Sequence, residues 1–301
     1  MSAKKDFLKL SDLSKSELTA LLKRALFIKK NDHRSRSLQG KMLGLIFEKE
    51  STRTRISFEV AMQRLGGGVT YLNQQTSQLS RGESYADTAR VLSRYLDGLV
   101  LRTFSQEGLD EVAAHSKVPV INGLTDLHHP CQVLADIMTI LEQFGSLNKM
   151  IVAYVGDGNN MTNTWIEAAM ILGFKLQVGC PKKYLPDAGL MTAAKTFKNI
   201  EIGSDPVKAV TGAHAINTDT WFSMGQKVSS EKRKAFSQFQ VNKALLKKAR
   251  PEAIVLHCLP AHRGEEITDE VLDGPHSVVF DEAENRLYVQ MAILEKYLGP
   301  K

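Results

Sequence analysis

Short apolar segments alternate with segments of helical periodicity along most of the chain, and this alternation limits the fold more than any other feature. Met42–Phe47, for example, has the length and composition of a buried strand, whereas Ile56–Leu65 repeats apolar residues at helical spacing. Alternating strands and helices favour mainly parallel sheets with helices on both faces, so we predict an α/β fold. The predicted strands are Met42–Phe47, Val69–Leu72, Gly98–Arg102, Val118–Asn122, Met150–Val155, Lys175–Cys180, Ile200–Ile202, Ala213–Asn217, Ala253–His257 and Ser277–Phe280.

The chain is long enough for two domains. It has 301 residues, of which 43% are hydrophobic, and a single core stops growing near ~250 to 300 residues. An amphipathic helix predicted from Pro130 stops at Gly145–Asn148, so we place a boundary there. We expect a first domain of residues 1–145, a second domain of residues 146–284, and a terminal helix, residues 285–301, that returns to the first domain.

Composition disfavours several classes of protein. No apolar run approaches the ~20 residues of a membrane span, and the N-terminus lacks the apolar core of a signal peptide, so we expect a cytoplasmic protein. Cys131, Cys180 and Cys258 are far apart, which predicts free thiols. The formal charge of +6 suits an anionic partner, but basic and acidic residues are interleaved, as in Glu231–Lys234, so we expect no nucleic-acid binding.

A run of hydroxyl and guanidinium groups, Ser51–Arg55, lies where the first predicted strand turns into a helix. The first turn of a helix has free N–H groups and a partial positive charge, which favour an anion. Arg53 and Arg55 keep their charge and match phosphate oxygens, to which the three hydroxyls of the run can also donate. Ser51 could instead be an ordinary N-cap beside two solvated arginines. The density of these groups favours a phosphate site.

Other polar clusters also follow predicted strands, at the end of a parallel sheet where ligands bind. Gly156–Met161 lacks the third glycine and the later acidic residue of a dinucleotide site, which disfavours a nicotinamide enzyme. Asn159 and Asn160 could bind a carboxylate or form a plain turn, and Asp219 could bind an amino group or cap a helix. The clusters are Arg102, His129–Gln132, Gly156–Met161, Thr218–Gly225 and His257–Pro260.

Histidine and cysteine chemistry receives little support from the spacing of these residues. His257 and Cys258 are neighbours on a strand, so their side chains point to opposite faces and a covalent cysteine mechanism is disfavoured. The histidines lack metal-ligand spacing, and we predict neither a metal nor a cofactor. The histidines considered are His128, His129, His257 and His262.

Six motifs, taken in order, resemble the family of aspartate and ornithine carbamoyltransferases over nearly the whole chain. Ser223–Gly225 and Cys258 are similar to the ornithine branch, because the aspartate enzymes lack both features. Cys131 departs from the threonine that the family has in its His-Pro-x-Gln motif, and we expect little consequence. The six motifs are Ser51–Arg55, His129–Gln132, Asp157–Asn160, Asp219–Gly225, His257–Pro260 and Ala283–Arg286.

The resemblance implies the role of each site residue. It assigns catalysis to Thr54, Arg102, His129 and Cys258. It assigns ornithine binding to Asn160, Asp219, Ser223 and Met224. It assigns carbamoyl phosphate binding to Ser51, Thr52, Arg53, Thr54, Gln78, Arg102, His129, Gln132, Cys258, Leu259 and Arg286, with Gln78 lent by a neighbouring subunit.

The resemblance also implies an activity and an assembly. The expected reaction moves the carbamoyl group of carbamoyl phosphate to the side-chain amine of L-ornithine, giving citrulline and phosphate, within arginine and citrulline metabolism. The expected active form is a homotrimer or a multiple of trimers. Two alternatives stay open: a carbamoyltransferase for another amine, such as aspartate, putrescine or an acylated ornithine, and a non-catalytic α/β ligand-binding protein.

Overall fold

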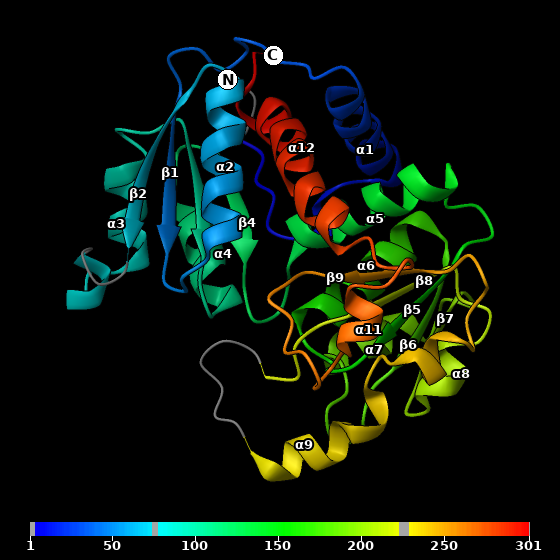
Figure 1. Cartoon of the computed structure of the whole chain (residues 1–301). Coiled ribbons are helices and arrows are strands. Elements are labelled where there is room, and N and C mark those ends of the chain that lie inside the picture. Colours follow the sequence, from blue (N-terminus) through cyan, green and yellow to red (C-terminus); the bar gives the residue numbers. More distant parts are fainter. Residues whose placement is uncertain (1–3, 74–77, 223–228, 301) are drawn as a thin grey trace. The chain divides into compact units, whose positions relative to one another are not determined.

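The computed structural model describes residues 4–73, 78–222 and 229–300. The chain divides into two compact units, one formed by Met1–Met138 with Glu284–Lys301 and the other by Thr139–Ala283. Each unit contains its own parallel sheet with helices packed against it, which confirms the predicted α/β fold (Figure 1). Among the described residues, no helix combines the length and apolar character needed to cross a membrane.

The first unit contains a four-stranded parallel sheet in the order β2-β1-β3-β4. The chain runs from β1 outward to β2 and then returns to the other side of β1 for β3, so the topology switches between β1 and β3. The strands are β1 (Met42–Phe47), β2 (Gly68–Asn73), β3 (Gly98–Arg102) and β4 (Val120–Leu124). The helices are η1 (Leu10–Asp12), α1 (Lys15–Lys30), α2 (Thr52–Arg64), η3 (Gln78–Arg81), α3 (Tyr85–Leu92), α4 (Gln106–His115) and parts of α5 (Pro130–Phe144) and α12 (Val279–Leu298).

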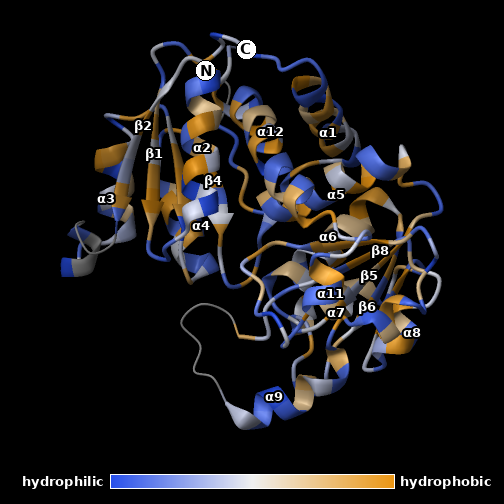
Figure 2. Ribbon diagram, in the orientation of Figure 1, coloured by the Kyte–Doolittle hydropathy of each residue, from blue (hydrophilic) through white to orange (hydrophobic). Residues whose placement is uncertain are grey.

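Side-chain alternation along these strands divides the first core into two layers. Leu99 and Leu101 of β3 pack with Leu109 and Val112 of α4. Val100 lies between them and is also fully buried, and it points to the opposite face, where α2 lies (Figure 1). The central strands are therefore apolar on both faces, as Figure 2 shows for β1.

The second unit contains a five-stranded parallel sheet in the order β7-β6-β5-β8-β9. Here the topology switches between β5 and β8, because β6 and β7 lie on one side of β5 and the later strands on the other. The strands are β5 (Ile151–Val155), β6 (Lys175–Gly179), β7 (Ile200–Gly203), β8 (Ala215–Thr218) and β9 (Ile254–His257). The helices are α6 (Asn160–Leu172), α7 (Ala188–Ala194), α8 (Pro206–Val210), α9 (Ser230–Phe236), η4 (Ser237–Phe239), α10 (Lys243–Leu246), α11 (Asp269–Leu272) and parts of α5 and α12.

One predicted strand is wrong. Ser277–Phe280 forms only an isolated bridge between Ser277 and Val255, and α12 begins at Val279. Asp281 and Glu282 in the first turn of α12 favour a helix start, because carboxylates stabilise the positive end of a helix. The remaining predicted strands are present with ends that differ by a few residues.

Candidate active site

The turn from β1 to α2 lies at the switch point of the first sheet. Ser51 is the N-cap of α2, and its hydroxyl accepts a hydrogen bond from the Thr54 N–H at 3.2 Å. The turn is tied to the end of β3, because the Glu48 N–H donates to the Arg102 carbonyl oxygen at 2.8 Å. Ligands bind at such switch points in open parallel sheets, so the local geometry fits the anion site predicted from the sequence.

Two arginines converge on the buried hydroxyl of Thr54. Arg102 Nη1 lies 3.4 Å from Thr54 Oγ1, and Arg286 Nη2 donates to the same oxygen at 2.6 Å. Arg286 also donates to Gln132 Oε1 at 2.7 Å, and the Gln132 amide donates to Asp136 at 2.7 Å. Residues from β3, α2, α5 and α12 thus meet in the first unit at the start of α2.

His129 lies beside this group and is 4% exposed. Burial lowers the pKa of its imidazole well below the ordinary value, and the charges of Arg286, Arg102 and Arg53 lower it further. The imidazole is therefore neutral near pH 7 and has one N–H donor and one acceptor nitrogen. Three guanidinium groups near one uncharged imidazole form a site that favours an anion.

Other residues of the predicted phosphate site lie in different surroundings. The Arg55 guanidinium pairs with Glu59 at 2.8 Å and stacks over the Tyr71 ring at 3.9 Å, so Arg55 is engaged along the outer face of α2. Thr52 is exposed at the helix start. Gln78 is exposed in η3, and its predicted role in a neighbouring subunit stays a prediction.

Cys131 is the residue at which this chain departs from the family motif. It is fully buried, and its thiol lies 3.4 Å from the Asn122 carbonyl oxygen. Burial raises the pKa of this thiol to about 12, so it stays protonated and donates that hydrogen bond. A threonine hydroxyl could donate in the same way, and the expectation of little consequence stays a prediction.

The turn from β5 to α6 lies at the switch point of the second sheet. Asn159 caps α6, with its Oδ1 accepting from the Met161 N–H at 3.0 Å, while its Nδ2 donates to Asp219 Oδ2 at 2.7 Å. The Cys258 thiol donates to the other oxygen of Asp219 at 3.1 Å. Asn160, the first residue of α6, is half-buried beside this turn. These contacts gather an acidic group, an amide and a thiol at one edge of the second sheet.

His257 organises the loop after β9. Its Nδ1 accepts from the Leu259 N–H at 2.9 Å, so the proton of a neutral ring is on Nε2, which lies 2.9 Å from Glu266 Oε1. His257 and Cys258 therefore bind different partners, as the alternation of side chains along a strand predicts. Cys258 and Leu259 belong to the second unit, and their contact with carbamoyl phosphate stays a prediction. Ser223 and Met224 lie outside the described residues.

Two clusters in the second unit bring possible metal ligands together among the described residues. The first is Asp219, His257 and Cys258, whose relevant atoms already take part in the hydrogen bonds given above. The second is His262, Glu265 and Glu266, where the Arg233 guanidinium pairs with Glu265 at 2.6 Å and competes with a cation. In each cluster, therefore, at least one possible ligand already has a hydrogen-bond or ion-pair partner in the protein.

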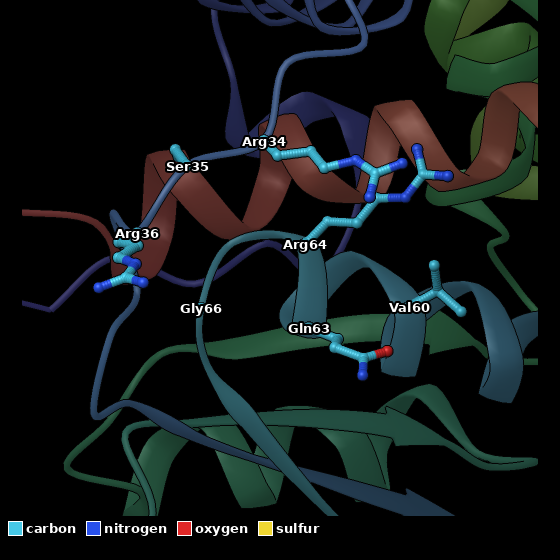
Figure 3. A pocket seen from close by; sticks show the side chains of 7 residues that line it. All are labelled: Arg34, Ser35, Arg36, Val60, Gln63, Arg64 and Gly66. Atoms are coloured by element: carbon cyan, nitrogen blue, oxygen red, sulfur yellow. The ribbon is translucent and has the colours of Figure 1, made fainter.

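A hollow of about 650 Å³ in the first unit lies at the C-terminal end of α2 and is lined by Arg34, Arg36 and Arg64. Figure 3 shows the Arg34 and Arg64 side chains extending to one side and the Arg36 side chain to the other, so the three groups do not converge. Asp32 lies within ion-pair distance of both Arg34 and Arg64. The C-terminal end of a helix also disfavours anions. This hollow lacks the convergence of the Thr54 site.

Two supporting residues, Glu48 and Lys49, have roles that the sequence alone did not predict. Glu48 accepts hydrogen bonds from Tyr85, at 2.6 Å, and from Thr103, and the buried Lys49 pairs with Asp126. These two residues brace the loop that leads to Ser51. Their signal in the sequence is a pair of charges between a buried strand and a phosphate-type turn.

Comparisons with known proteins agree over almost the entire chain. Residues 5–142 match the model for the aspartate/ornithine carbamoyltransferase carbamoyl-P binding domain, and residues 148–297 match the model for the Asp/Orn binding domain. The ornithine carbamoyltransferase of Desulfotalea psychrophila is 52% identical, with 96% of this chain and 98% of that chain covered. The one from Pelobacter propionicus is also 52% identical, with 97% and 98% covered.

Solved structures give the same result. The ornithine carbamoyltransferase from Pyrococcus furiosus is 48% identical and matches with a TM-score of 0.94, covering 99% of both chains. The fold, the arginine-rich turn and these relatives agree. The chain therefore belongs to the aspartate/ornithine carbamoyltransferase family.

Proposed function

We propose that this chain is an enzyme that transfers the carbamoyl group of carbamoyl phosphate to the side-chain amine of L-ornithine, giving L-citrulline and phosphate. The observation that carries the proposal is the convergence of Arg102 and Arg286 on Thr54 beside a neutral, buried His129. Relatives named ornithine carbamoyltransferase, matched over 98% of their length, support the same reaction. A non-catalytic ligand-binding protein is not favoured.

The phosphate of carbamoyl phosphate binds at the start of α2. The N–H groups of the first helical turn and the hydroxyls of Ser51, Thr52 and Thr54 donate to its oxygens. Arg53 and Arg102 supply the opposite charge, and a planar guanidinium can hold two phosphate oxygens at once. These donors and arginines bind an anion better than a neutral ligand. Without an anion, the positive charges of the arginines repel one another.

The carbonyl group of carbamoyl phosphate faces Thr54, Arg102 and His129. Attack by an amine places negative charge on the carbonyl oxygen, and donors already aimed at that oxygen stabilise it. His129 suits this role because its neutral imidazole can donate a hydrogen bond while carrying no charge of its own. Gln132 holds the carbamoyl amide, and Arg286 orients Gln132 through the 2.7 Å hydrogen bond.

Ornithine binds on the second unit. We assign its α-ammonium group to Asp219 and Ser223 and its α-carboxylate to Asn160 and Met224. Asn159 and Cys258 hold the two oxygens of Asp219 and so fix its orientation. The Cys258 thiol, next to the carboxylate, also lies on the loop that carries Leu259.

The reaction requires a neutral side-chain amine, because a protonated amine has no lone pair. An amine with a pKa near 10.4 costs about 4 to 5 kcal/mol to deprotonate at pH 7. Loss of water around the amine lowers that cost. A carbon–nitrogen bond then forms to the carbonyl carbon, the bond to the phosphate oxygen breaks, and the departing phosphate takes the amine proton.

The assignment of domains and the assembly belong to the same proposal. Residues 1–145 with 285–301 bind carbamoyl phosphate, and residues 146–284 bind ornithine. The active form is a cytoplasmic homotrimer, or a multiple of trimers, in which Gln78 completes the site of a neighbouring subunit. Light scattering after gel filtration tests this assembly, because a fully active monomer would contradict it.

A colour assay for citrulline tests the reaction itself. Purified protein with carbamoyl phosphate and ornithine should form citrulline, whereas aspartate or putrescine in place of ornithine should give little carbamoylated product. Asp219 supports this preference for ornithine, since its carboxylate complements the α-ammonium group of an amino acid. Faster reaction with putrescine or aspartate would favour the alternative carbamoyltransferase, and no transfer to any amine would refute the enzyme.

A further inference from the structure

A lysine ammonium group lies buried in the second unit, next to the turn that carries Asn159. Lys232, in α9, is 8% exposed, and its Nζ lies 2.7 Å from Asp157 Oδ2. The rings of Tyr184, Phe222 and Phe236 lie 5.1, 5.4 and 5.4 Å from the same nitrogen. Lysine is rarely this buried, and it stays charged there only with an anionic partner and favourable ring contacts.

The partner of this lysine belongs to the β5–α6 turn. Asp157 precedes Gly158, and the Asp157 carbonyl oxygen accepts from the Thr162 hydroxyl at 2.6 Å. Gly158 has no room for a side chain, because a Cβ there would lie 2.2 Å from the backbone carbon of Leu185. The Gly158 N–H donates to the Tyr184 carbonyl oxygen at 3.0 Å. The turn is thus held from one side by backbone and from the other by Lys232.

The same turn determines where Asp219 points. Asn159 is two residues beyond Asp157, and its amide donates to Asp219 at 2.7 Å. A shift of the turn would move this amide relative to the carboxylate. Burial raises the pKa of Asp157 while Lys232 lowers it, so without the ammonium group the carboxylate would take up a proton or move toward water.

We propose that Lys232 is a positioning residue for the amino-acid substrate, acting through Asp157 on the turn that places Asn159 and Asp219. The proposal rests on the proposed function, because it assumes that Asp219 receives ornithine. Lys232 touches neither substrate in this account. Its loss therefore affects ornithine and leaves carbamoyl phosphate, which binds at the Ser51 turn, unaffected.

The test compares three variants by steady-state kinetics and calorimetry. Lys232→Met keeps the length and the ring contacts and removes the charge, and we expect the KM for ornithine to rise about tenfold or more, the loss typical of a displaced charged contact. The Kd for carbamoyl phosphate should stay within about twofold, a change smaller than one lost hydrogen bond would cause. Lys232→Arg restores a cation and should recover most of the loss.

Lys183→Met is the matched control. Lys183 also pairs with a carboxylate, that of Glu231, at 2.8 Å, but both side chains are about three-quarters exposed, at 75% and 73%. An exposed ion pair contributes little, so this variant should have the same KM for ornithine and the same Kd for carbamoyl phosphate as the unaltered protein. If Lys232→Met does not fold, Asp157→Asn removes the other half of the pair and should raise the KM for ornithine in the same selective way.

Several outcomes would overturn the proposal. A lower midpoint of thermal unfolding with an unchanged KM for ornithine would make the pair purely structural. An equal loss of affinity for ornithine and for carbamoyl phosphate would exclude a selective role of Lys232. Citrulline formation by the unaltered protein separates these results from a failure of the proposed function, since an inactive wild type would refute both together.

Discussion

The two sheets present the same backbone device with opposite side-chain charges. In each unit a helix starts at a topological switch point, capped by Ser51 in the first and by Asn159 in the second. Two guanidinium groups converge on Thr54 in the helical turn that Ser51 caps, whereas Asn159 donates to the carboxylate of Asp219. The fold supplies a positive helix end in both places, and the side chains determine which charge is bound.

This difference separates the two substrates by chemistry. At the Ser51 turn, helix charge and arginine charge add, which suits a phosphate. At the Asn159 turn, the cap occupies free N–H groups and Asp219 adds negative charge, while the charge of Asp157 is matched by Lys232, so the turn suits a ligand with an amino group. The following predictions test whether each turn serves only its own ligand.

The largest effect is expected at the first turn. Arg102→Met removes a donor from the carbonyl and phosphate site, and kcat should fall by about 10² to 10³-fold. Arg55→Met is the control on the neighbouring helix, because Arg55 pairs with the partly exposed Glu59 and should matter less than about twofold. Steady-state kinetics measures both, and equal losses would show that charge alone, rather than position, governs the turn.

A smaller, selective effect is expected at the second turn. Asp219→Asn keeps the shape of the side chain and removes its charge, so the KM for ornithine should rise by about 10- to 100-fold, as for a lost charged hydrogen bond. The Kd for carbamoyl phosphate should stay unchanged. A change in carbamoyl phosphate affinity alone would show that the second unit is assigned to the wrong substrate.

The smallest effect concerns the pH dependence of stability. The unfolded chain takes up a proton on His129 near pH 6.5, whereas the folded chain does not, because burial and arginine charge lower the folded pKa. The contribution of His129 to stability is thus present above pH 6.5 and is lost as pH falls toward the folded pKa. Between pH 7.5 and 5.5 the free energy of unfolding of His129→Gln should fall by about 1 kcal/mol less than that of the unaltered protein. Urea unfolding measures this difference, and identical slopes would contradict a neutral His129.

Local patterns in the sequence account for much of the fold and for the location of the site. The apolar run Met42–Phe47 and the capping Ser51 depend on neighbouring residues only, so periodicity and helix-start chemistry predict them. The rule that ligands bind beyond strand ends places Ser51, Arg102 and Asp219 near switch points. Ser277–Phe280 was wrong because an apolar pair, Val278 and Val279, is compatible with a strand and with a helix start.

Partners distant along the chain could not be predicted from such patterns. Arg286 reaches Thr54 across 232 positions, and the choice of Thr54 rather than another acceptor depends on how α12 packs. Lys232 appears in the sequence as one charge in a run of charged residues, yet its Nζ is buried 2.7 Å from Asp157. Burial is a property of the folded chain, and so is the strength with which a charge interacts with its partner.

Calorimetric titration of carbamoyl phosphate into Arg53→Ala is the most direct test of the anion-binding turn. We expect at least about tenfold weaker binding than for the unaltered protein, because Arg53 adds charge where the start of α2 already favours a phosphate. Asp219→Asn, titrated in parallel, should bind as the unaltered protein does. Unchanged affinity in Arg53→Ala would contradict the claim that the helix start at Ser51 holds the phosphate.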